Sequence, residues 1–266
     1  MNENHKPQIL LTNDDGILSP GLWAAAEALS EIAFVHVAAP REQASGMGRS
    51  MPAASDGIIE TRQVTIHTKT WTVYSVGGSP AQVVLHAVLE ILPSLPKLVV
   101  SGINYGENFG TGVTISGTVG AALEGAALGV PGLAVSLEVA KQHQLGYSTD
   151  VDFSVAAHFT RLFAGKMLAG QLLGDVDVIK VEVPAQATVA THWKPARLSR
   201  KRYYQSLVPP GRDWNQPAQL DYNQAPDLEN FERDSDVYVT RVEKLVAVTP
   251  LSLDLTSRVD LGKLFR

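Results

Sequence analysis

The chain has 266 residues, of which 45% are hydrophobic and 18% are charged, and its formal net charge is −5. This balance is typical of a globular protein and excludes a disordered or collagen-like chain. The net negative charge argues against a protein that wraps a nucleic-acid duplex, and the absence of cysteine excludes disulfide frameworks, thiolate metal sites and cysteine nucleophiles.

The chain begins with the polar residues MNENHKPQ, which lack the apolar core of a signal peptide. No later run approaches the ~20 apolar residues of a membrane helix. We therefore expect a soluble, cytoplasmic protein with no membrane partner.

Over residues 8–135, short apolar runs alternate with longer segments of helical spacing, a pattern that indicates βαβ units around a mostly parallel sheet. Residues 39–60 are rich in Gly, Ser and Pro and predict a long loop. A hairpin that turns at Lys69-Thr70 is expected beside the main sheet. In chain order, we expect strands at residues 9–11, 34–38, 65–67, 72–76, 98–100 and 133–135, and helices at 20–32, 80–92 and 118–128.

The second half of the chain predicts a helix over 152–173 and a strand over 176–183. Residues 185–235 carry five prolines among polar residues, which favours an extended arm over a core. Two late strands are expected at 237–239 and 245–248. We therefore divide the chain into an α/β core, residues 1–184, and an extended arm with a hairpin, residues 185–266.

The first candidate site is Thr12-Asn13-Asp14-Asp15-Gly16, directly after an apolar strand. Open α/β sheets bind ligands beyond the carboxyl ends of their strands. Two adjacent carboxylates repel each other, and a hard divalent cation such as Mg²⁺ or Mn²⁺ relieves that repulsion. The same residues also favour a simple turn, so both interpretations stay open.

The second candidate site is the segment 101–120, which holds six glycines where the average of the chain predicts fewer than two. Ser116-Gly117-Thr118 opens a predicted helix, where free amides and the helix dipole favour a phosphate, although Ser116 or Thr118 could simply cap the helix. The lysine of a P-loop and the spacing G-x-G-x-x-G are both missing, so an ATPase or a Rossmann dehydrogenase is not expected. A third, weaker candidate is Ser45 in the long loop.

Five motifs follow one another in the chain: I-L-L-T-N-D-D-G at 9–16, A-P-R through S-G at 39–46, G-S-P at 78–80, S-G-I-N-Y-G-E-N-F-G at 101–110, and S-G-T-V through E-G at 116–125. Taken together, they resemble the SurE family of metal-dependent nucleotidases, also called survival proteins and stationary-phase acid phosphatases. A weaker match returns late in the chain, in Asp236 and in V-T-P-L at 248–251 followed by D-L-T at 254–256.

The resemblance implies a three-layer α/β/α sheet of Rossmann-like type, with a C-terminal extended arm whose β-hairpin is exchanged between the subunits of a homodimer or homotetramer. It also implies roles for individual residues. The divalent metal would be held by Asp14, Asp15, Ser45 and Asn104. The substrate phosphate would be bound by Ser116, Gly117 and Thr118, with Asn108 in the same loop.

The chain also departs from the family pattern. Gln82 stands where the family has an aspartate, and Gly112 and Ile115 stand where it has aspartate and tyrosine. Lys180 and Glu182 replace asparagines in the last strand of the predicted core. None of these changes removes a metal ligand, and they bear on substrate preference and turnover rate.

The leading hypothesis is metal-dependent hydrolysis of nucleoside monophosphates, of 5′-nucleotides and also of 3′-nucleotides, with Asp14 or Asp15 accepting a proton from water. A dehalogenase-type phosphatase would need the pattern D-x-D, whereas these aspartates are adjacent. A regulatory module that binds nucleotides with little or no turnover is the alternative from another class. The histidines show no metal-ligand spacing and receive no role.

Overall fold

The structure, a computed structural model, describes residues 6–144, 147–218 and 220–265, so the polar N-terminal residues 1–5 lie outside it. Within the described ranges, no helix combines the length and the apolar character needed to cross a membrane. The strands are β1 (Gln8–Thr12), β2 (Phe34–Pro40), β3 (Ile59–Ile66), β4 (Lys69–Val76), β5 (Leu98–Tyr105), β6 (Gly132–Leu137), β7 (Val178–Val183), β8 (Trp193–Pro195), β9 (Tyr204–Leu207), β10 (Asp221–Gln224) and β11 (Val246–Leu251).

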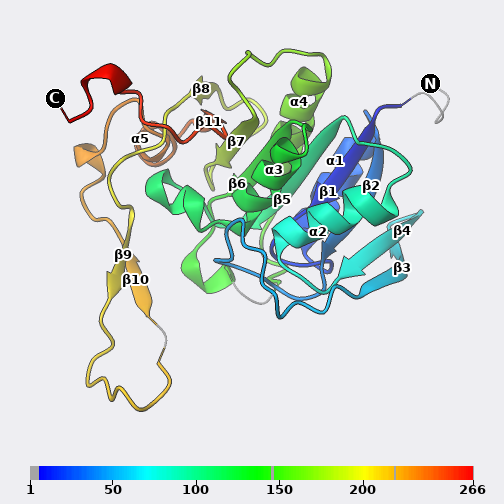
Figure 1. The fold of residues 1–266 in the computed structure, drawn as a ribbon, viewed down its shortest axis with the longest axis horizontal. Coiled ribbons are helices and arrows are strands. Elements are labelled where there is room, and N and C mark those ends of the chain that lie inside the picture. The colour runs from blue at the N-terminus through cyan, green and yellow to red at the C-terminus, as the bar shows by residue number, and fades with distance from the viewer. Residues whose placement is uncertain (1–5, 145–146, 219, 266) are drawn as a thin grey trace.

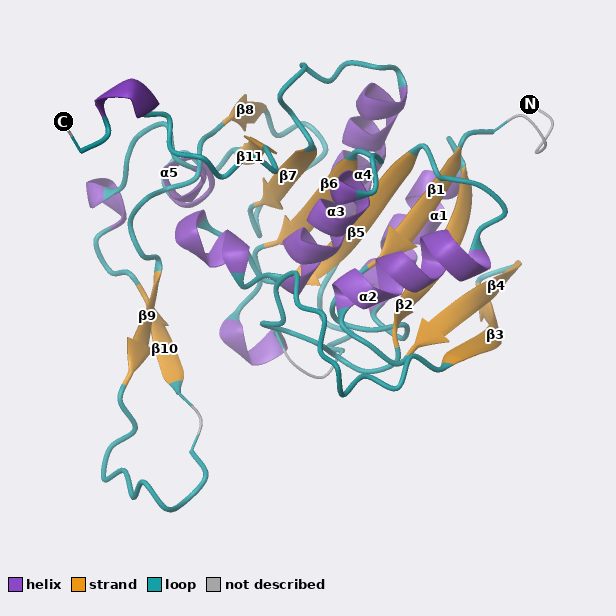
Figure 2. Ribbon diagram, in the orientation of Figure 1, coloured by secondary structure: helices purple, strands orange, loops and turns teal. Residues whose placement is uncertain are grey.

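A single mixed sheet in the order β3-β4-β2-β1-β5-β6-β7-β11-β8 forms the middle layer, between two helical layers (Figure 1; Figure 2). The first and fourth helices contact each other on one face of the sheet, and the second and third do so on the other face. The predicted three-layer α/β/α architecture is confirmed. The helices are α1 (Pro20–Ser30), α2 (Pro80–His86, continued by a π-helical turn over Ala87–Ile91), α3 (Gly117–Ala127), α4 (Ser154–Leu168) and α5 (Asp236–Arg241).

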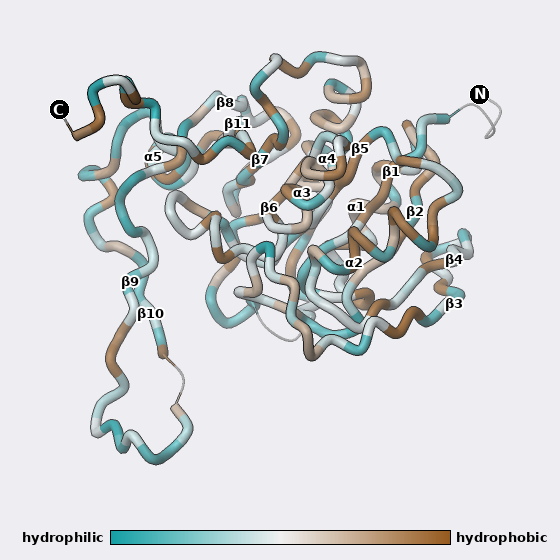
Figure 3. The backbone as a smooth tube through the Cα atoms, in the orientation of Figure 1, coloured by the Kyte–Doolittle hydropathy of each residue, from teal (hydrophilic) through white to brown (hydrophobic). Residues whose placement is uncertain are grey.

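The central strands are apolar on both faces because helices cover both sides of a parallel sheet. In β1, Ile9 and Leu11 pack into the cluster beneath α1 and α4, whereas Leu10 packs beneath α2 and α3. Hydrophobic segments accordingly concentrate in the sheet and the helices over it (Figure 3). Local signals set the helix starts: Pro20 occupies the first turn of α1, and Ser79 with Gln82 forms a capping box at α2.

Strands β4, β2, β1, β5, β6 and β7 run parallel to one another, so their carboxyl ends meet at one edge. Strand β5 is longer than predicted. It continues to Tyr105 after a bulge between Ser101 and Asn104, and Asn104 therefore lies on the strand and not in the loop. The glycine-rich segment begins only at Gly106, directly beyond this edge.

Two other expectations were wrong: the position of the hairpin turn and the late strand at 237–239. Lys69 and Thr70 belong to β4 and pair with Ile66 and Thr65, so the hairpin turns at His67-Thr68. That hairpin also extends the main sheet, because β4 pairs with β2.

Val237–Val239 is helical, although its β-branched residues predict a strand. Ser235 caps α5 by accepting a hydrogen bond from the Tyr238 amide at 3.3 Å, which overrides that propensity. The other late strand is confirmed as β11.

The predicted arm carries a hairpin, which is formed by β9 and β10 and projects away from the sheet (Figure 1). Strands β8 and β11 also lie beyond residue 184, and both join the edge of the main sheet. The division of the chain into two parts at residue 184 stays a prediction.

Candidate active site

Two buried carboxylates follow β1. Asp14 and Asp15 are 4% and 1% exposed. Asp14 Oδ1 accepts a hydrogen bond from Thr118 Oγ1 at 2.5 Å. Asp15 Oδ1 accepts one from Gln43 Nε2 at 3.1 Å, and Asp15 Oδ2 accepts one from the Tyr105 amide at 3.3 Å. The carboxylate pair is therefore held by the C-terminal end of β5, the N-terminal turn of α3 and the loop after β2.

All of these donors are neutral. In the part of the chain that the structure describes, neither Asp14 nor Asp15 forms an ion pair. Burial raises the pKa of Asp14, and burial together with the charge of Asp14 raises the pKa of Asp15 to about 8. Two buried carboxylates without a counter-charge fit a bound cation, which offsets both their repulsion and their lost hydration.

The donor set indicates what kind of cation fits. Among the described residues, no group of three or more His, Asp or Glu side chains could hold a metal. A cation at Asp14 and Asp15 would therefore need neutral oxygen ligands as well, which hard divalent cations accept.

The N-terminus of α3 lies against Asp14. Ser116 is the N-cap, and its Oγ accepts a hydrogen bond from the Val119 amide at 3.1 Å, which confirms the capping role. The amides of Gly117 and Thr118 belong to the first turn, where the helix offers no backbone acceptors. An anion is favoured at such a terminus. A cation at the aspartates and an anion at this terminus would thus be adjacent.

Gly117 has no room for a side chain, because a Cβ there would lie 2.7 Å from Asp14 Cβ. We expect Gly117→Ala to displace Asp14 from α3 and to weaken Mn²⁺ binding about tenfold or more, the effect of a cost of ~1.4 kcal/mol. Calorimetric titration with Mn²⁺ measures this change. Gly112→Ala is the matched control, since no atom lies within 4 Å of the Cβ it would add. Equal affinities of the two variants would contradict the prediction.

Ser45 and Asn104 each adjoin in sequence a residue that contacts the pair, Ala44 and Tyr105 respectively. The amide of Ala44 donates a hydrogen bond to the Asp14 carbonyl at 2.7 Å, and Ser45, the next residue, is exposed. Asn104 Nδ2 donates to the Gly106 carbonyl at 2.6 Å, which commits the amide nitrogen and leaves Asn104 Oδ1 as the atom that could coordinate a cation. Both residues stand next to a residue that contacts the pair.

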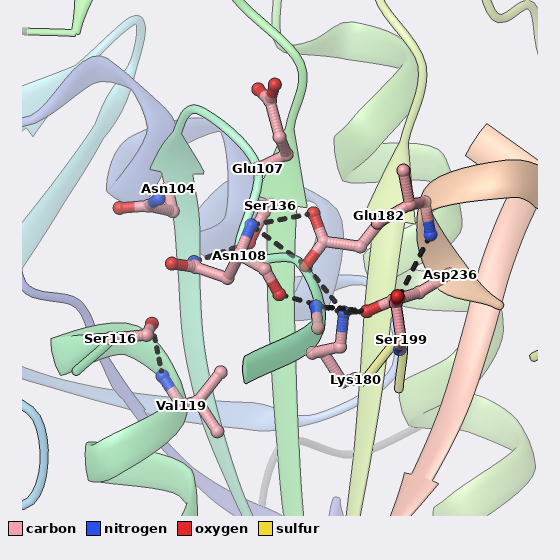
Figure 4. A network of polar contacts seen from close by, with 12 residues as sticks. Asn104, Glu107, Asn108, Ser116, Val119, Ser136, Lys180, Glu182, Ser199 and Asp236 are labelled. Carbon is pink, nitrogen blue, oxygen red and sulfur yellow. Dashed lines mark hydrogen bonds and ion pairs between the residues drawn. The ribbon is translucent and has the colours of Figure 1, made fainter. Parts of the chain in front are cut away.

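Asn108, another predicted site residue, contacts β6 through its side chain and β7 through its backbone (Figure 4). Asn108 Nδ2 donates to Ser136 Oγ at 3.0 Å, and the Asn108 backbone contacts Lys180 and Glu182 on β7. The side chain is thereby tied to β6. Its contact with phosphate stays a prediction.

Sequence reasoning missed the partners that orient the pair. Besides Gln43, Tyr147 contributes by donating from its hydroxyl to the Asp15 carbonyl at 2.8 Å. Gln43 falls within the span of the motif at 39–46 but is not one of its matched residues, Tyr147 lies in no motif, and only tertiary contact identifies the two. Gln82, one of the departures from the family pattern, accepts from Ser55 Oγ at 2.7 Å and donates to the Pro52 carbonyl at 3.0 Å, so it ties the long loop to α2.

Two hollows open at the surface. One of about 340 Å³ is lined by Gln43, Ala44, Met47 and Ser79, next to the carboxylate pair. A larger one, of about 490 Å³, lies at the base of the arm between Glu138, Lys141 and Arg241 and is lined by none of the predicted site residues. Neither hollow is lined by a predicted site residue, but the first adjoins the carboxylate pair through Gln43, which donates to Asp15, and Ala44, whose amide donates to the Asp14 carbonyl.

Fold and site together define an α/β protein with paired carboxylates beyond the carboxyl end of a parallel strand, beside a helix N-terminus of the kind that suits a phosphate-type anion. The family described as Survival protein SurE matches residues 9–205. The chain belongs to this SurE family, and the resemblance of its motifs is confirmed.

Relatives and a solved structure agree with this assignment over nearly the whole chain. A protein of Thermococcus gammatolerans named 5′-nucleotidase SurE is 41% identical and covers 97% of this chain and 94% of its own length. A protein of the same name from Thermococcus kodakarensis is 39% identical, with 95% of both chains covered. The crystal structure of the SurE protein from Aquifex aeolicus, 31% identical, superposes with a TM-score of 0.75 over 94% of this chain and 95% of its own.

Proposed function

We propose that the chain is a divalent-metal-dependent phosphomonoesterase that hydrolyses nucleoside monophosphates to nucleoside and phosphate. The observation that carries the proposal is the buried, uncompensated pair Asp14–Asp15 against the N-terminus of α3. The names of the relatives, which are 5′-nucleotidases, support the same activity. We propose 5′-nucleotides as the main substrates and 3′-nucleotides as a second class.

The metal, Mg²⁺ or Mn²⁺, would be held by oxygen atoms of Asp14, Asp15, Ser45 and Asn104. When bound there, it supplies a positive charge that attracts phosphate and makes water more acidic. The hydrogen bond from Thr118 orients one oxygen of Asp14, and those from Gln43 and the Tyr105 amide orient Asp15. Asp14 or Asp15 would accept the proton of the attacking water.

The phosphate would lie at the start of α3. The amides of Gly117 and Thr118 would donate to its oxygens as negative charge develops, and the Ser116 hydroxyl, which accepts from Val119, retains a proton to donate. Asn108 would contact the phosphate from the same loop. Preorganised donors of this kind favour the transition state over the bound substrate.

The nucleoside would occupy the hollow lined by Gln43, Ala44, Met47 and Ser79. Its volume of about 340 Å³ is within the range of ligand pockets, ~300–1,000 Å³. Gln43 borders both the hollow and Asp15, so a phosphate near the pair would carry its nucleoside towards this space.

A panel of 5′- and 3′-nucleoside monophosphates, incubated with the purified protein in Mn²⁺, in Mg²⁺ and in EDTA, tests the proposal. We expect phosphate release with a metal and none in EDTA, with 5′-nucleotides cleaved fastest. A general substrate, p-nitrophenyl phosphate, is the control for chemistry without a nucleoside. Binding of nucleotides without release in either metal would instead identify a regulatory binding module.

We further propose that the arm joins subunits into a homodimer or homotetramer. Val208 and Trp214, on the projecting hairpin segment, are 83% and 89% exposed, and exposed apolar side chains on such a segment favour burial against another chain. The substrate is small, and neither a nucleic-acid duplex nor a membrane is proposed as a partner. A cytoplasmic location is proposed from the absence of cysteine.

A further inference from the structure

Three charged side chains lie completely buried behind the glycine-rich segment. Lys180 and Glu182 on β7 and Asp236 at the start of α5 are each 0% exposed. Buried charges are costly unless each one is paired and hydrogen-bonded. Lys180 Nζ lies 3.1 Å from Glu182 Oε1 and 3.0 Å from Asp236 Oδ2. We call these three residues the buried triad.

Almost every hydrogen-bonding position of the triad is used. The three N–H bonds of Lys180 serve the two carboxylates and the Asn108 carbonyl, at 3.0–3.1 Å. Asp236 Oδ2 also accepts from the Gly110 amide at 2.8 Å, and Asp236 Oδ1 accepts from the amides of Ser199 and Val237 at 3.0 and 2.9 Å. A fully satisfied buried network specifies a single geometry.

The triad holds the backbone of the glycine-rich segment. Besides the Asn108 carbonyl and the Gly110 amide, it binds the Asn108 amide, which donates to both Glu182 oxygens at 3.2 Å. Figure 4 shows Lys180 and Glu182 at the Asn108 backbone, with Asp236 next to Lys180. Phe109, between these residues, is 1% exposed and packs edge-on against Tyr203, with ring centroids 5.0 Å apart. Three consecutive residues are thus anchored to β7 and to the C-terminal part of the chain.

This anchored stretch lies between the two halves of the proposed site. Asn104, at its N-terminal side, is a proposed metal ligand, and Ser116, at its C-terminal side, begins the proposed phosphate site. Gly110 leaves no room for adjustment, since its φ is +50° and a Cβ would lie 2.8 Å from the Ser199 carbonyl oxygen. The position of residues 108–110 therefore determines how the segment enters α3.

We propose that Lys180, Glu182 and Asp236 are positioning residues, which hold residues 108–110 so that Asn108 and the start of α3 face the substrate phosphate. This inference rests on the proposed function. None of the three touches substrate, and all act through the backbone of the glycine-rich segment. Lys180 and Glu182 are departures from the family pattern, so this chain builds the anchor from charges.

Asp236→Asn separates positioning from the role of Asp236 in its own helix. With its carbonyl oxygen at the position of Oδ1, asparagine still accepts from Ser199 and Val237. Its amide nitrogen replaces Oδ2 and accepts neither from Lys180 nor from the Gly110 amide. Ser199→Ala is the matched control, because it removes the contacts of the Ser199 hydroxyl with Glu232 and Lys201 but keeps the Ser199 amide bond to Asp236.

The kinetic measurement uses the full chain in saturating Mn²⁺, well below the melting temperature of each variant. We expect Asp236→Asn to lower kcat for a nucleoside monophosphate at least tenfold, with Mn²⁺ affinity within twofold of wild type. Ser199→Ala should stay within twofold of wild type in both quantities. A purely structural role would lower the melting temperature and leave kcat unchanged.

Hydrogen–deuterium exchange over residues 106–116 gives a second measurement that needs no activity. We expect exchange at Gly110 to be at least tenfold faster in Asp236→Asn than in Ser199→Ala. Equal exchange and equal kcat in the two variants would overturn the inference. If wild type releases no phosphate, the proposed function fails, and the exchange measurement still decides on positioning.

Glu182→Gln replaces Asp236→Asn if that variant does not fold. Glutamine at this position accepts through one oxygen and so loses one of the contacts with Lys180 or the Asn108 amide. Faster exchange at Asn108 and a lower kcat than in Ser199→Ala are expected, and wild-type values for both would overturn the inference.

Discussion

Asp14→Asn is expected to reduce metal-dependent phosphate release about 10³-fold or more while the protein stays folded. A metal supplies several kcal/mol of transition-state stabilisation, and ~4 kcal/mol corresponds to a factor of about 10³ in rate. Asparagine has the same shape but removes one of the two charges that attract the cation. Its carbonyl oxygen still accepts from Thr118, so the local packing is preserved.

The measurement is phosphate release from a 5′-nucleotide over a range of Mn²⁺ concentrations, with melting temperature in EDTA as the test of folding. The melting temperature should not fall, because the substitution relieves a buried repulsion between Asp14 and Asp15. Asp150→Asn, at an exposed position, is the control and should keep wild-type activity. An active Asp14→Asn protein would remove the pair from the mechanism.

Glu182→Gln is expected to gain stability relative to wild type as pH rises from about 4.5 to about 7. Burial raises the pKa of Glu182 from 4.5 to about 7, even though Lys180 acts to lower it. Burial alone would lower the pKa of Lys180, but Asp236 and Glu182 raise it. The triad has two carboxylates for one ammonium, so one carboxylate carries excess charge when all three ionise.

The sign follows from proton binding. The folded state binds a proton at Glu182 more tightly than the unfolded state, so wild type has this stability below pH 4.5 and loses it as pH rises through 7. At ~1.4 kcal/mol per pKa unit, the difference between variant and wild type should change by up to roughly 3 kcal/mol across this window.

Urea unfolding at pH 4.5 and pH 8 measures this difference in unfolding free energy. Glu243→Gln is the control, because Glu243 pairs with Lys194 at the surface, where exposed pairs contribute ~0–1 kcal/mol. A difference that stays constant with pH would show that folding does not raise the pKa of Glu182.

The parts of the fold that sequence predicts are those with local causes. Strand β1 is a short apolar run, α1 and α2 begin with proline, and Ser116 caps α3. These features place Asp14 and Asp15 beyond a strand and Gly117 at a helix start. Asp14 lies close to Gly117 because β1 and β5 are parallel and end at the same edge of the sheet, where the segment that leads into α3 begins.

What sequence reasoning missed depends on distant residues. Val237–Val239 has strand propensity, yet the Ser235 cap makes it helical. Charges within the apolar strand β7 are visible in the sequence, but their purpose is not, because Asp236 lies 56 residues beyond Lys180. Only the folded chain brings that carboxylate to Gly110.

The anchor of residues 108–110 also sets an order of events during synthesis. Every proposed metal ligand and phosphate contact lies before residue 119, whereas the Asp236 carboxylate that holds Gly110 lies 126 residues after that glycine. A nascent chain that has only reached residue 184 carries all of these ligands, but not Ser199 or Asp236. With these proposed roles, the site is complete only after the C-terminal part of the chain has folded back onto β7.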